Sequence, residues 1–339
     1  MPSFSHFTIR VFFFVILLTG IFYFLGTRLF IPSKVLLQVA ITQIAPHPSL
    51  DKIRSGIIDA LSMEKLAAAH VPPVEIIFQN AQGNMATATQ IAKKFAGIHP
   101  KVIVPITTPS AQTVYNVAKD RSIPIVFAAV SDPKTARLMP SGVHDLITGV
   151  SDLAPISEQA ALIADIFKGK ESIVLGIIFN PGEANSVHLV ELMTQALEKY
   201  PIKVLKATAG NTTEVTAAVQ SLMGKVSAIY LPNDNTVISA LEAVLRTTHE
   251  HKIPVFSSDP ESVERGCLAA IAPDQYEIGQ QVGSLVIKIL QGYDIRKLPI
   301  EPAKKNIFIL NLDVARKLSV TIPKEMEQKA TRLIVSTAE

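Results

Sequence analysis

Cysteine, tryptophan and tyrosine are scarce in this 339-residue chain, which has one cysteine, no tryptophan and six tyrosines. The lone Cys267 excludes a disulfide framework and a multi-cysteine metal site. It precedes the apolar run Leu268-Ala269-Ala270, which favours a buried, inert thiol over a nucleophile. Because flat aromatic faces are what a sugar ring packs against, the shortage of tryptophan and tyrosine disfavours a carbohydrate ligand.

Charge is scarce as well: charged residues make up 18% of the chain and the formal net charge is +3. The basic residues are scattered, whereas a nucleic-acid surface needs a dense Lys/Arg stripe. The chain also lacks a G-x-S-x-G elbow, an H-E-x-x-H motif and a P-loop lysine. His249 and His251, two residues apart near an expected helix end, would point to different sides. We therefore expect a protein that is not an enzyme and has no catalytic residue, metal or cofactor.

Residues 11–26 are almost wholly apolar and lie between Arg10 and Arg28. As a helix this stretch rises roughly 24 Å, which is marginal for a bilayer core of about 30 Å. No small-residue cleavage pattern follows it, and no cysteine is present there to carry a lipid. We expect residues 1–33 to form a signal or anchor segment, with an uncleaved anchor preferred to a cleaved signal peptide. Either interpretation predicts an exported body, periplasmic or anchored to the cytoplasmic membrane and facing outward.

From residue 35 onward, short runs rich in Val and Ile alternate with longer stretches of helical spacing. Nearly continuous apolar runs are typical of parallel strands covered on both faces. The first series of runs covers residues 35–41, 74–78, 102–106 and 124–130, and the second covers 173–179, 202–207, 228–231, 254–257 and 268–272. Between them, helical spacing covers residues 50–69, 86–97 and 187–200. This order predicts βαβ units and right-handed, doubly wound sheets.

Prolines and glycines interrupt the alternation at residues 131–154 and 292–304, and we expect a third crossover near 271–274. The sequence therefore predicts an α/β protein with two Rossmann-like, doubly wound parallel-sheet lobes joined by a hinge, preceded by an N-terminal hydrophobic helix. We assign residues 34–152 and 272–300 to lobe 1, and residues 153–271 and 301–339 to lobe 2.

In doubly wound sheets, ligands bind at the carboxyl ends of the strands. The backbone N–H groups of residues 108–111 would suit a carboxylate there, and an ammonium group would need an acidic partner such as Asp132, Glu183 or Asp234. This mixture favours an amino acid or another small zwitterion. The polar residues expected at this edge are Gln43, Thr107, Thr108, Ser110, Asp132, Asn180, Glu183, Asn185, Asn233, Asp234, Asn235 and Asp259.

Several of these residues also have a purely structural interpretation. One such interpretation is a capping box, in which the side chains of Asn180 and Glu183 bond to each other's backbone N–H groups in the segment Asn180-Pro181-Gly182-Glu183. Thr108 and Asp259 each precede a proline and could be simple N-caps, and Asp132 could form an Asx-turn. His47, which lies between two prolines, is expected to be an exposed turn residue rather than a ligand contact.

A set of loops along the chain resembles the ABC transporter substrate-binding proteins, in the branch similar to tryptophan- and phenylalanine-binding lipoproteins. The matching stretches are residues 41–43, 47–51, 131–133, 147–152, 180–186, 232–237, 257–266 and 315–323, which together span most of residues 35–325. The resemblance implies a type I periplasmic-binding fold and capture of a small polar ligand, an amino acid that could be aromatic, in the cleft between the lobes. It also implies an ABC permease in the inner membrane as partner, and we expect a monomer.

The chain departs from that branch in lacking the cysteine that carries the lipid. A membrane-tethered sensor of a signalling system therefore stays open as an alternative, as does a nucleoside-like ligand. A cytosolic repressor of the same fold would have a DNA-binding helix-turn-helix before the body, where this chain has its apolar segment.

Overall fold

The computed structural model describes residues 36–139 and 146–336. The expected signal or anchor segment lies outside these residues. Within the described part of the chain, no helix combines the length and the apolar character needed to cross a bilayer. By its contacts the chain divides into residues 1–36 and a second compact unit, residues 37–339, which holds both predicted lobes.

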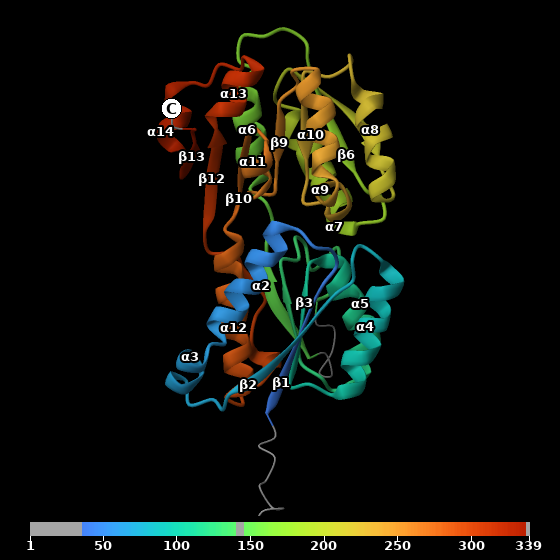
Figure 1. Cartoon of the computed structure of the whole chain (residues 1–339), viewed down its shortest axis with the longest axis vertical. Coiled ribbons are helices and arrows are strands. Elements are labelled where there is room, and N and C mark those ends of the chain that lie inside the picture. Colours follow the sequence, from blue (N-terminus) through green and yellow to red (C-terminus); the bar gives the residue numbers. More distant parts are fainter. Residues whose placement is uncertain (1–35, 140–145, 337–339) are drawn as a thin grey trace, which may run out of the picture. The chain divides into compact units, whose positions relative to one another are not determined.

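Lobe 1 is built on a six-stranded sheet with the strand order β11-β5-β4-β3-β1-β2, and its paired strands run parallel. Helices α2 and α12 lie together on one side of the sheet and α4 and α5 on the other (Figure 1). The strands are β1 (Leu37–Gln43), β2 (Val74–Asn80), β3 (Val102–Ile106), β4 (Ile125–Ala128), β5 (Ile147–Ser151) and β11 (Glu301–Pro302); the helices are α2 (Pro48–Ala60), α3 (Met63–Ala68), α4 (Met85–Ile98), α5 (Thr108–Ala118), η1 (Lys119–Arg121), α12 (Gln275–Leu290) and η3 (Ile295–Lys297).

Lobe 2 has a seven-stranded sheet with the order β13-β12-β10-β9-β8-β6-β7. One apolar core packs α6, α7 and α13 against the sheet, and a second packs α8, α9 and α10. The strands are β6 (Ile173–Phe179), β7 (Ile202–Thr208), β8 (Ala228–Leu231), β9 (Val255–Ser257), β10 (Ala269–Pro273), β12 (Asn306–Asn311) and β13 (Arg332–Ile334); the helices are α6 (Ile156–Ile166), α7 (Ala184–Leu197), η2 (Thr212–Glu214), α8 (Val215–Leu222), α9 (Asn235–Ser239), α10 (Leu241–Glu250), α11 (Ser262–Arg265), α13 (Leu312–Leu318) and α14 (Lys324–Lys329).

Each of the nine predicted strand runs coincides with a strand of the structure, and the two α/β sheets form two lobes as expected. The expectation of purely parallel sheets is wrong at β12, which runs antiparallel to β10. Strand β5 went unrecognised because its Gly149 stands in a proline- and glycine-rich stretch that read as irregular. The predicted helix over residues 50–69 is two helices, α2 and α3, separated at Leu61 and Ser62.

The chain changes sheets three times: between β5 and α6, between β10 and α12, and between β11 and β12. The last two changes fall about two residues later than the predicted divisions at 271/272 and 300/301. Pro273 still pairs with Asn306 in the lobe 2 sheet, and Pro302 still pairs with Ser151 in the lobe 1 sheet. Each proline is the final residue of its strand, and the chain leaves that sheet after it.

Helices α2 and α12 cross at very short range because two glycines face one another's backbone. A Cβ atom at Gly56 would overlap the carbonyl oxygen of Tyr276, and one at Gly279 would overlap that of Ile53. Helix α12 follows the second hinge segment directly, and α2 carries residues 47–50 to the end of lobe 1. The glycine contact therefore holds the start of α2 in a fixed position relative to the hinge.

Candidate ligand-binding site

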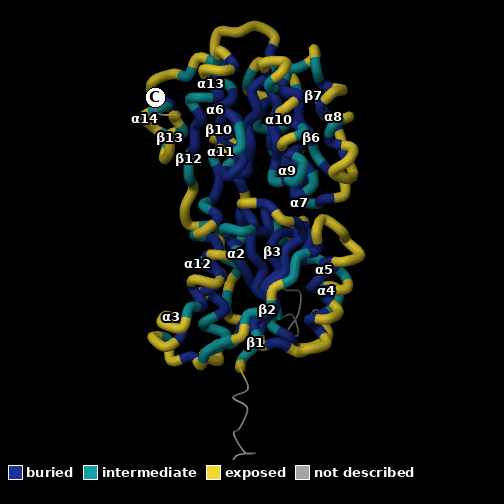
Figure 2. Tube along the Cα trace, viewed as in Figure 1, coloured by how far each residue is buried: buried dark blue, intermediate teal, exposed yellow. Residues whose placement is uncertain are grey.

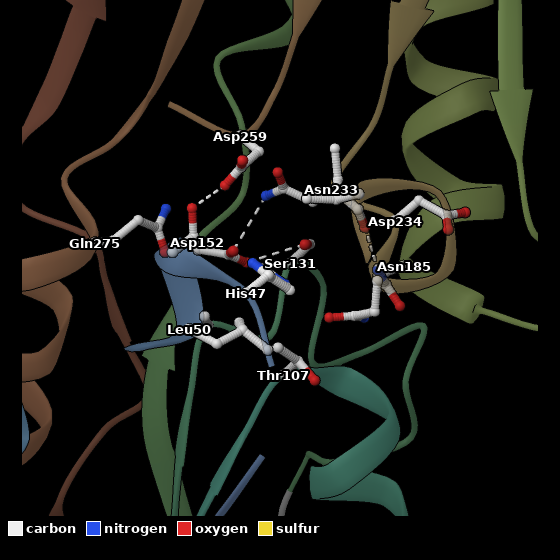
Figure 3. A pocket seen from close by; sticks show the side chains of 14 residues that line it. His47, Leu50, Thr107, Ser131, Asp152, Asn185, Asn233, Asp234, Asp259 and Gln275 are labelled. Carbon is white, nitrogen blue, oxygen red and sulfur yellow. Dashed lines mark hydrogen bonds between the residues drawn. The ribbon is translucent and has the colours of Figure 1, made fainter. Parts of the chain in front are cut away.

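The carboxyl ends of the parallel strands in the two lobes face one another, and the loops that follow them enclose a cavity of about 30 Å³. Both lobes are buried along these facing ends as well as in their cores (Figure 2). Figure 3 shows polar side chains converging on the cavity from both sides. The lining residues are His47, Ser49, Leu50, Thr107, Ala129, Ser131, Asp152, Asn185, Asn233, Asp234, Asn235, Ile238, Asp259 and Gln275.

The structure brings only part of the predicted set to this cavity. The predicted residues that line it are Thr107, Asn185, Asn233, Asp234, Asn235 and Asp259, and those that do not are Gln43, Thr108, Ser110, Asp132, Asn180 and Glu183. Gln43 is held within lobe 1, where its side chain bonds to Ala45, Asp51 and Arg54. The sequence reasoning missed Ser49, Ser131, Asp152 and Gln275. Asp152 directly follows the unrecognised strand β5, so recognising that strand would have placed its carboxylate at the ligand edge.

Glu183 organises a loop of lobe 2 rather than the start of its own helix. Its Oε2 accepts hydrogen bonds from the backbone N (3.1 Å) and Nδ2 (2.6 Å) of Asn235, and its Oε1 accepts from the N (3.0 Å) and Oγ1 (2.8 Å) of Thr236. The predicted capping box with Asn180 is therefore wrong. Helix α7 begins at Ala184, and the Asn180 side chain accepts from the backbone N of Gly182 instead. Glu183 satisfies donors at the start of α9, a different helix.

Asp234 is bonded to the same loops through both carboxylate oxygens. Its Oδ1 accepts from the backbone N of Val237 at 2.8 Å, which caps α9. Its Oδ2 accepts from the backbone N of Asn180 at 2.5 Å and from Oγ of Ser186 at 2.6 Å. Burial, together with the nearby charge of Glu183, raises the pKa of Asp234 to about 7. All three of these hydrogen bonds to Asp234 come from residues of lobe 2.

Asp152 accepts two side-chain hydrogen bonds in the described structure, one fewer than the number that Asp234 accepts. Its Oδ1 accepts from Oγ of Ser131 at 2.9 Å and its Oδ2 accepts from Nδ2 of Asn233 at 3.2 Å (Figure 3). A carboxylate can accept about four hydrogen bonds, so each oxygen retains capacity toward the cavity. Burial raises the pKa of Asp152 to about 6, with a further contribution from the nearby charge of Asp259. This combination suits a partner that brings a positive charge.

The N-terminus of α5 presents unbonded polar groups at the end of lobe 1. The hydroxyls of Thr107, Thr108 and Ser110 are buried and have no hydrogen-bond partner among the described residues. Thr108 is not the N-cap that the sequence suggested: Thr107 holds that position and its side chain makes no capping bond. The first-turn N–H groups of Thr108 and Ser110 have no acceptor within the helix, and the helix dipole adds to their attraction for an anion.

Two residues on neighbouring strand ends, both lining the cavity, hold the left-handed backbone conformation that non-glycine residues rarely adopt. Thr107, after β3, has φ +76°, and Ala129, after β4, has φ +53°. Such conformations cost roughly 1–3 kcal/mol each and gather at binding sites.

His47 is buried, not the exposed turn residue that its flanking prolines suggested. It lines the cavity together with Asn235 of lobe 2, and its Nδ1 is buried with no partner within the described residues. Burial lowers the pKa of His47, against the opposing effect of the Asp259 carboxylate. The imidazole is therefore neutral near pH 7.

Besides the Asn233–Asp152 hydrogen bond, further contacts within the described residues join the facing ends of the lobes. Lys52 Nζ lies 2.8 Å from Glu261 Oε2, His188 Nε2 lies 3.4 Å from Asp132 Oδ2, and the Ser49 hydroxyl donates to Asp259. Asp132 also forms the Asx-turn considered from the sequence, accepting from the backbone N of Lys134 at 2.9 Å. Burial by itself would raise the pKa of Asp132, but hydrogen bonds from Thr135 and Lys134 hold that pKa below the usual value.

Asp259 has a structural role as well as its place in the cavity. Its Oδ2 accepts from the backbone N of Ser262, the first residue of α11, at 3.0 Å. Throughout residues 36–139 and 146–336, no group of three or more His, Cys, Asp or Glu side chains is arranged to hold a metal ion. The cavity can instead offer an anion-binding helix terminus, an under-bonded carboxylate and neutral acceptors.

Comparison with known proteins finds the same architecture in characterised families. The family model described as ABC transporter substrate binding protein matches residues 38–334. A protein named tyrosine-binding protein from Clostridioides difficile is 34% identical over 290 residues, which cover 85% of this chain and 82% of that protein.

Two solved structures are similar over nearly the whole described body. A conserved domain protein from Vibrio cholerae has a TM-score of 0.81 and 38% identity, covering 87% of this chain and 99% of that one. An ABC domain from Streptococcus pneumoniae in complex with L-Trp has a TM-score of 0.80 and 29% identity, covering 87% of this chain and all (100%) of that one.

Proposed function

The chain belongs to the ABC transporter substrate-binding protein family, and we propose that it captures an aromatic L-amino acid between its lobes and delivers it to an ABC permease. Members of this family are extracytoplasmic transport binding proteins rather than enzymes. The ligand class is supported by two relatives, one named for tyrosine binding and one solved with L-Trp. We further propose that the body works as a monomer outside the inner membrane, either periplasmic or held there by residues 1–33.

The observation that carries the proposal is that one cavity combines a site suited to an anion with a site suited to a cation. The α-carboxylate of the ligand would meet Thr107, which lines the cavity just before α5 and whose hydroxyl is unbonded, where the helix dipole also favours an anion. The α-ammonium would meet Asp152, whose oxygens keep lone pairs free. A zwitterion satisfies both ends at once, whereas a neutral sugar satisfies neither charge requirement.

The apolar part of the cavity suits a ring contributed by the ligand. Leu50 comes from α2, Ala129 from the end of β4 and Ile238 from α9, so both lobes supply an aliphatic wall. No aromatic side chain is among the lining residues of the described chain. An aromatic ligand would therefore bury its ring against aliphatic carbons from both lobes, which favours closure through the hydrophobic effect.

Entry of such a ligand requires the lobes to separate. A cavity of about 30 Å³ has room for roughly two water molecules, and an aromatic amino acid is several times larger. Separation would break the Lys52–Glu261, Asp132–His188 and Ser49–Asp259 contacts and bend the three hinge segments.

A thermal-shift screen of the full chain purified in detergent tests the ligand class. We expect L-tyrosine, L-tryptophan or L-phenylalanine to raise the unfolding midpoint, because binding to the folded state stabilises it by mass action. Aliphatic amino acids, nucleosides, simple sugars and D-tryptophan serve as controls. Stabilisation by nucleosides alone would contradict the amino-acid assignment, and no stabilisation by any compound would favour a role other than solute capture.

A further inference from the structure

A loop of lobe 2 between β9 and α11, residues 258–261, rests on the first turns of α2 in lobe 1. The Ser49 hydroxyl donates to Oδ1 of Asp259, which reaches from lobe 2 toward the start of α2 (Figure 3). Nζ of Lys52 lies 2.8 Å from Oε2 of Glu261. Ser49 and Lys52 are three residues apart, so they share one face of α2. The loop therefore meets α2 at its N-terminus, where the helix dipole is positive.

The residues of α2 leave the N-terminus of this helix without a cap of their own. The N-cap residue is His47, whose side chain makes no capping hydrogen bond in the described structure. Pro48 has no N–H, and the first N–H group with a helical acceptor is that of Asp51. The two N–H groups between these residues therefore lack an acceptor within the helix. Asp51, the acid of the first turn, lies 2.8 Å from the Arg54 guanidinium, so its charge is already compensated.

Asp259 is a buried carboxylate without a cation. It is 5% exposed, and none of the ion pairs found in residues 36–139 and 146–336 includes it. Besides Ser49, its hydrogen-bond donors are the backbone N and the hydroxyl of Ser262, at the start of α11. A buried charge is costly unless hydrogen bonds and nearby positive potential replace its hydration. Helix α11 has four residues and α2 has thirteen, so the dipole of α2 is the larger of the two that face this carboxylate.

Each side of this contact is attached to the same hinge segment, residues 273–274. On the lobe 1 side, the glycine contact fixes α2 against α12, which follows the segment directly. On the lobe 2 side, the Ser258 hydroxyl donates to Oε1 of Gln159 at 3.1 Å. Nε2 of Gln159 in turn donates to the backbone O of Ile271 at 2.5 Å, on β10 just before the segment. A change of angle at residues 273–274 would therefore separate Asp259 from the start of α2.

We propose that Asp259 is the N-terminal cap of α2, supplied by the opposite lobe, and that it stabilises the closed arrangement before any ligand is bound. Asp259 is then a positioning residue, because it holds the facing strand ends of the two lobes at one spacing. When the lobes separate, water hydrates the carboxylate and the start of α2 separately, and the attraction between charge and dipole is lost. This inference deepens the proposed capture and rests on it only for the purpose of closure, since the cap itself forms without a ligand.

Distances between two spin labels in the ligand-free full chain test this inference. The labels are placed at Lys94→Cys on α4 and Glu191→Cys on α7, which are exposed positions of the two lobes, while the native Cys267 is buried. Double electron–electron resonance then gives the ratio of closed to open molecules. In Asp259→Asn, which keeps the shape and removes the charge, we expect this ratio to fall by about three- to tenfold. The cap that Asp259 provides to α11 is weakened in both states alike, so it does not alter the ratio.

Matched variants at the N-cap position separate capping of α2 from general damage to the contact. The backbone of His47 is extended, as an N-cap requires, so His47→Ser gives α2 a side-chain cap in both states. Relative to His47→Ala, it should lower the closed-to-open ratio by about twofold and reduce the further effect of Asp259→Asn by about half or more. Glu64→Gln, which removes an exposed charge from α3, is the control and should change nothing.

An equal ratio in Asp259→Asn and the wild type would overturn the inference, as would a ligand-free wild type found only in the open form. A loss of affinity in Asp259→Asn with an unchanged ligand-free ratio would make Asp259 a ligand contact instead. Equal ratios in His47→Ser and His47→Ala would also overturn it, and this comparison decides the question even where Asp259→Asn does not fold. Because no ligand is added, failure of every amino acid to bind would overturn the proposed function and leave this result unchanged.

Discussion

The two lobes use the polar residues of the loops around the cavity in opposite ways. Lobe 2 brings Glu183 and Asp234, and the described structure gives these two carboxylates seven hydrogen bonds, all within the lobe. Lobe 1 brings the hydroxyls of Thr107, Thr108 and Ser110, for which the described residues provide no partner. The two acids use their hydrogen bonds to hold loops of lobe 2 together, although their charge would suggest a ligand contact. The neutral hydroxyls can still form hydrogen bonds to a ligand. Remaining hydrogen-bonding capacity, rather than charge, distinguishes the groups available to a ligand.

The strongest test of this contrast is removal of the Asp234 carboxylate. Asp234→Ala would leave the backbone N–H groups of Asn180 and Val237 and the hydroxyl of Ser186 without their acceptor. We expect the free energy of unfolding to fall by about 3–5 kcal/mol, measured by urea denaturation. Asp234→Asn is the matched control and should cost less, because a carboxyl group with a pKa of about 7 is already partly protonated at neutral pH. Full stability of Asp234→Ala combined with a large loss of affinity would reverse the assignment and make Asp234 a ligand contact.

Asp152 should show the opposite response, a loss of binding with little loss of stability. Asp152→Asn keeps the shape and removes the charge that the α-ammonium requires. We expect affinity for the aromatic amino acid to fall by about 2–3 kcal/mol, or roughly 30- to 150-fold, as measured by calorimetry. Unchanged affinity would exclude Asp152 as the ammonium partner.

The pH dependence of binding offers a second test of Asp152. Its pKa is about 6 in the folded protein against an ordinary 3.8, so between these pH values the folded state holds more protons than the unfolded state. The stability contribution of this carboxyl is thus present at low pH and is lost as the pH rises through about 6. Ligand binding runs the other way: an ammonium needs the ionised carboxylate, so affinity should fall by up to about tenfold per pH unit below 6. Titrations at pH 5, 6, 7 and 8 should show this fall in the wild type and a much weaker one in Asp152→Asn.

A smaller effect is expected at the N-terminus of α5. Thr107→Ala removes the hydroxyl of the residue that lines the proposed carboxylate site and leaves the first-turn N–H groups of α5 in place. We expect a loss of about 1 kcal/mol in binding, roughly fivefold, and no loss of stability, because the hydroxyl has no protein partner in the described structure. A drop in the melting temperature without any change in affinity would assign Thr107 to packing and weaken the contrast between the lobes.

The smallest effect is expected at the contact between Lys52 and Glu261. Lys52→Met should weaken ligand affinity by about 0.5–1 kcal/mol, because the contact exists only when the lobes are closed and the lysine is half exposed. High salt should produce a similar weakening in the wild type and little further change in the variant. Lys65→Met, on the side of lobe 1 where Lys65 contacts Gln280, is the control and should leave affinity unchanged. Equal affinity of Lys52→Met and the wild type in low salt would show that this pair does not contribute to closure.

The sequence by itself was enough to predict the order of the strands along the chain and the sheet edge at which we expect a ligand to bind. Runs such as residues 102–106 and 173–179 are buried on both faces. Burial on both faces favours continuous Val and Ile, so the pattern can be recognised from the local sequence. The α5 terminus could be found in the same way, since a polar stretch after an apolar run marks the end of a parallel strand. Strand β5 escaped because a strand of five residues containing Gly149 has no such pattern.

Only the tertiary structure decided which of the polar side chains are already bonded. Glu183 meets Asn235 across 52 positions of the sequence, and Ser49 meets Asp259 across 210. His47 is buried at the cavity that both lobes line, a fact that its flanking prolines do not encode. Local pattern fixes where a side chain stands on its strand or helix, but the number of hydrogen bonds it has left depends on segments that only folding brings together.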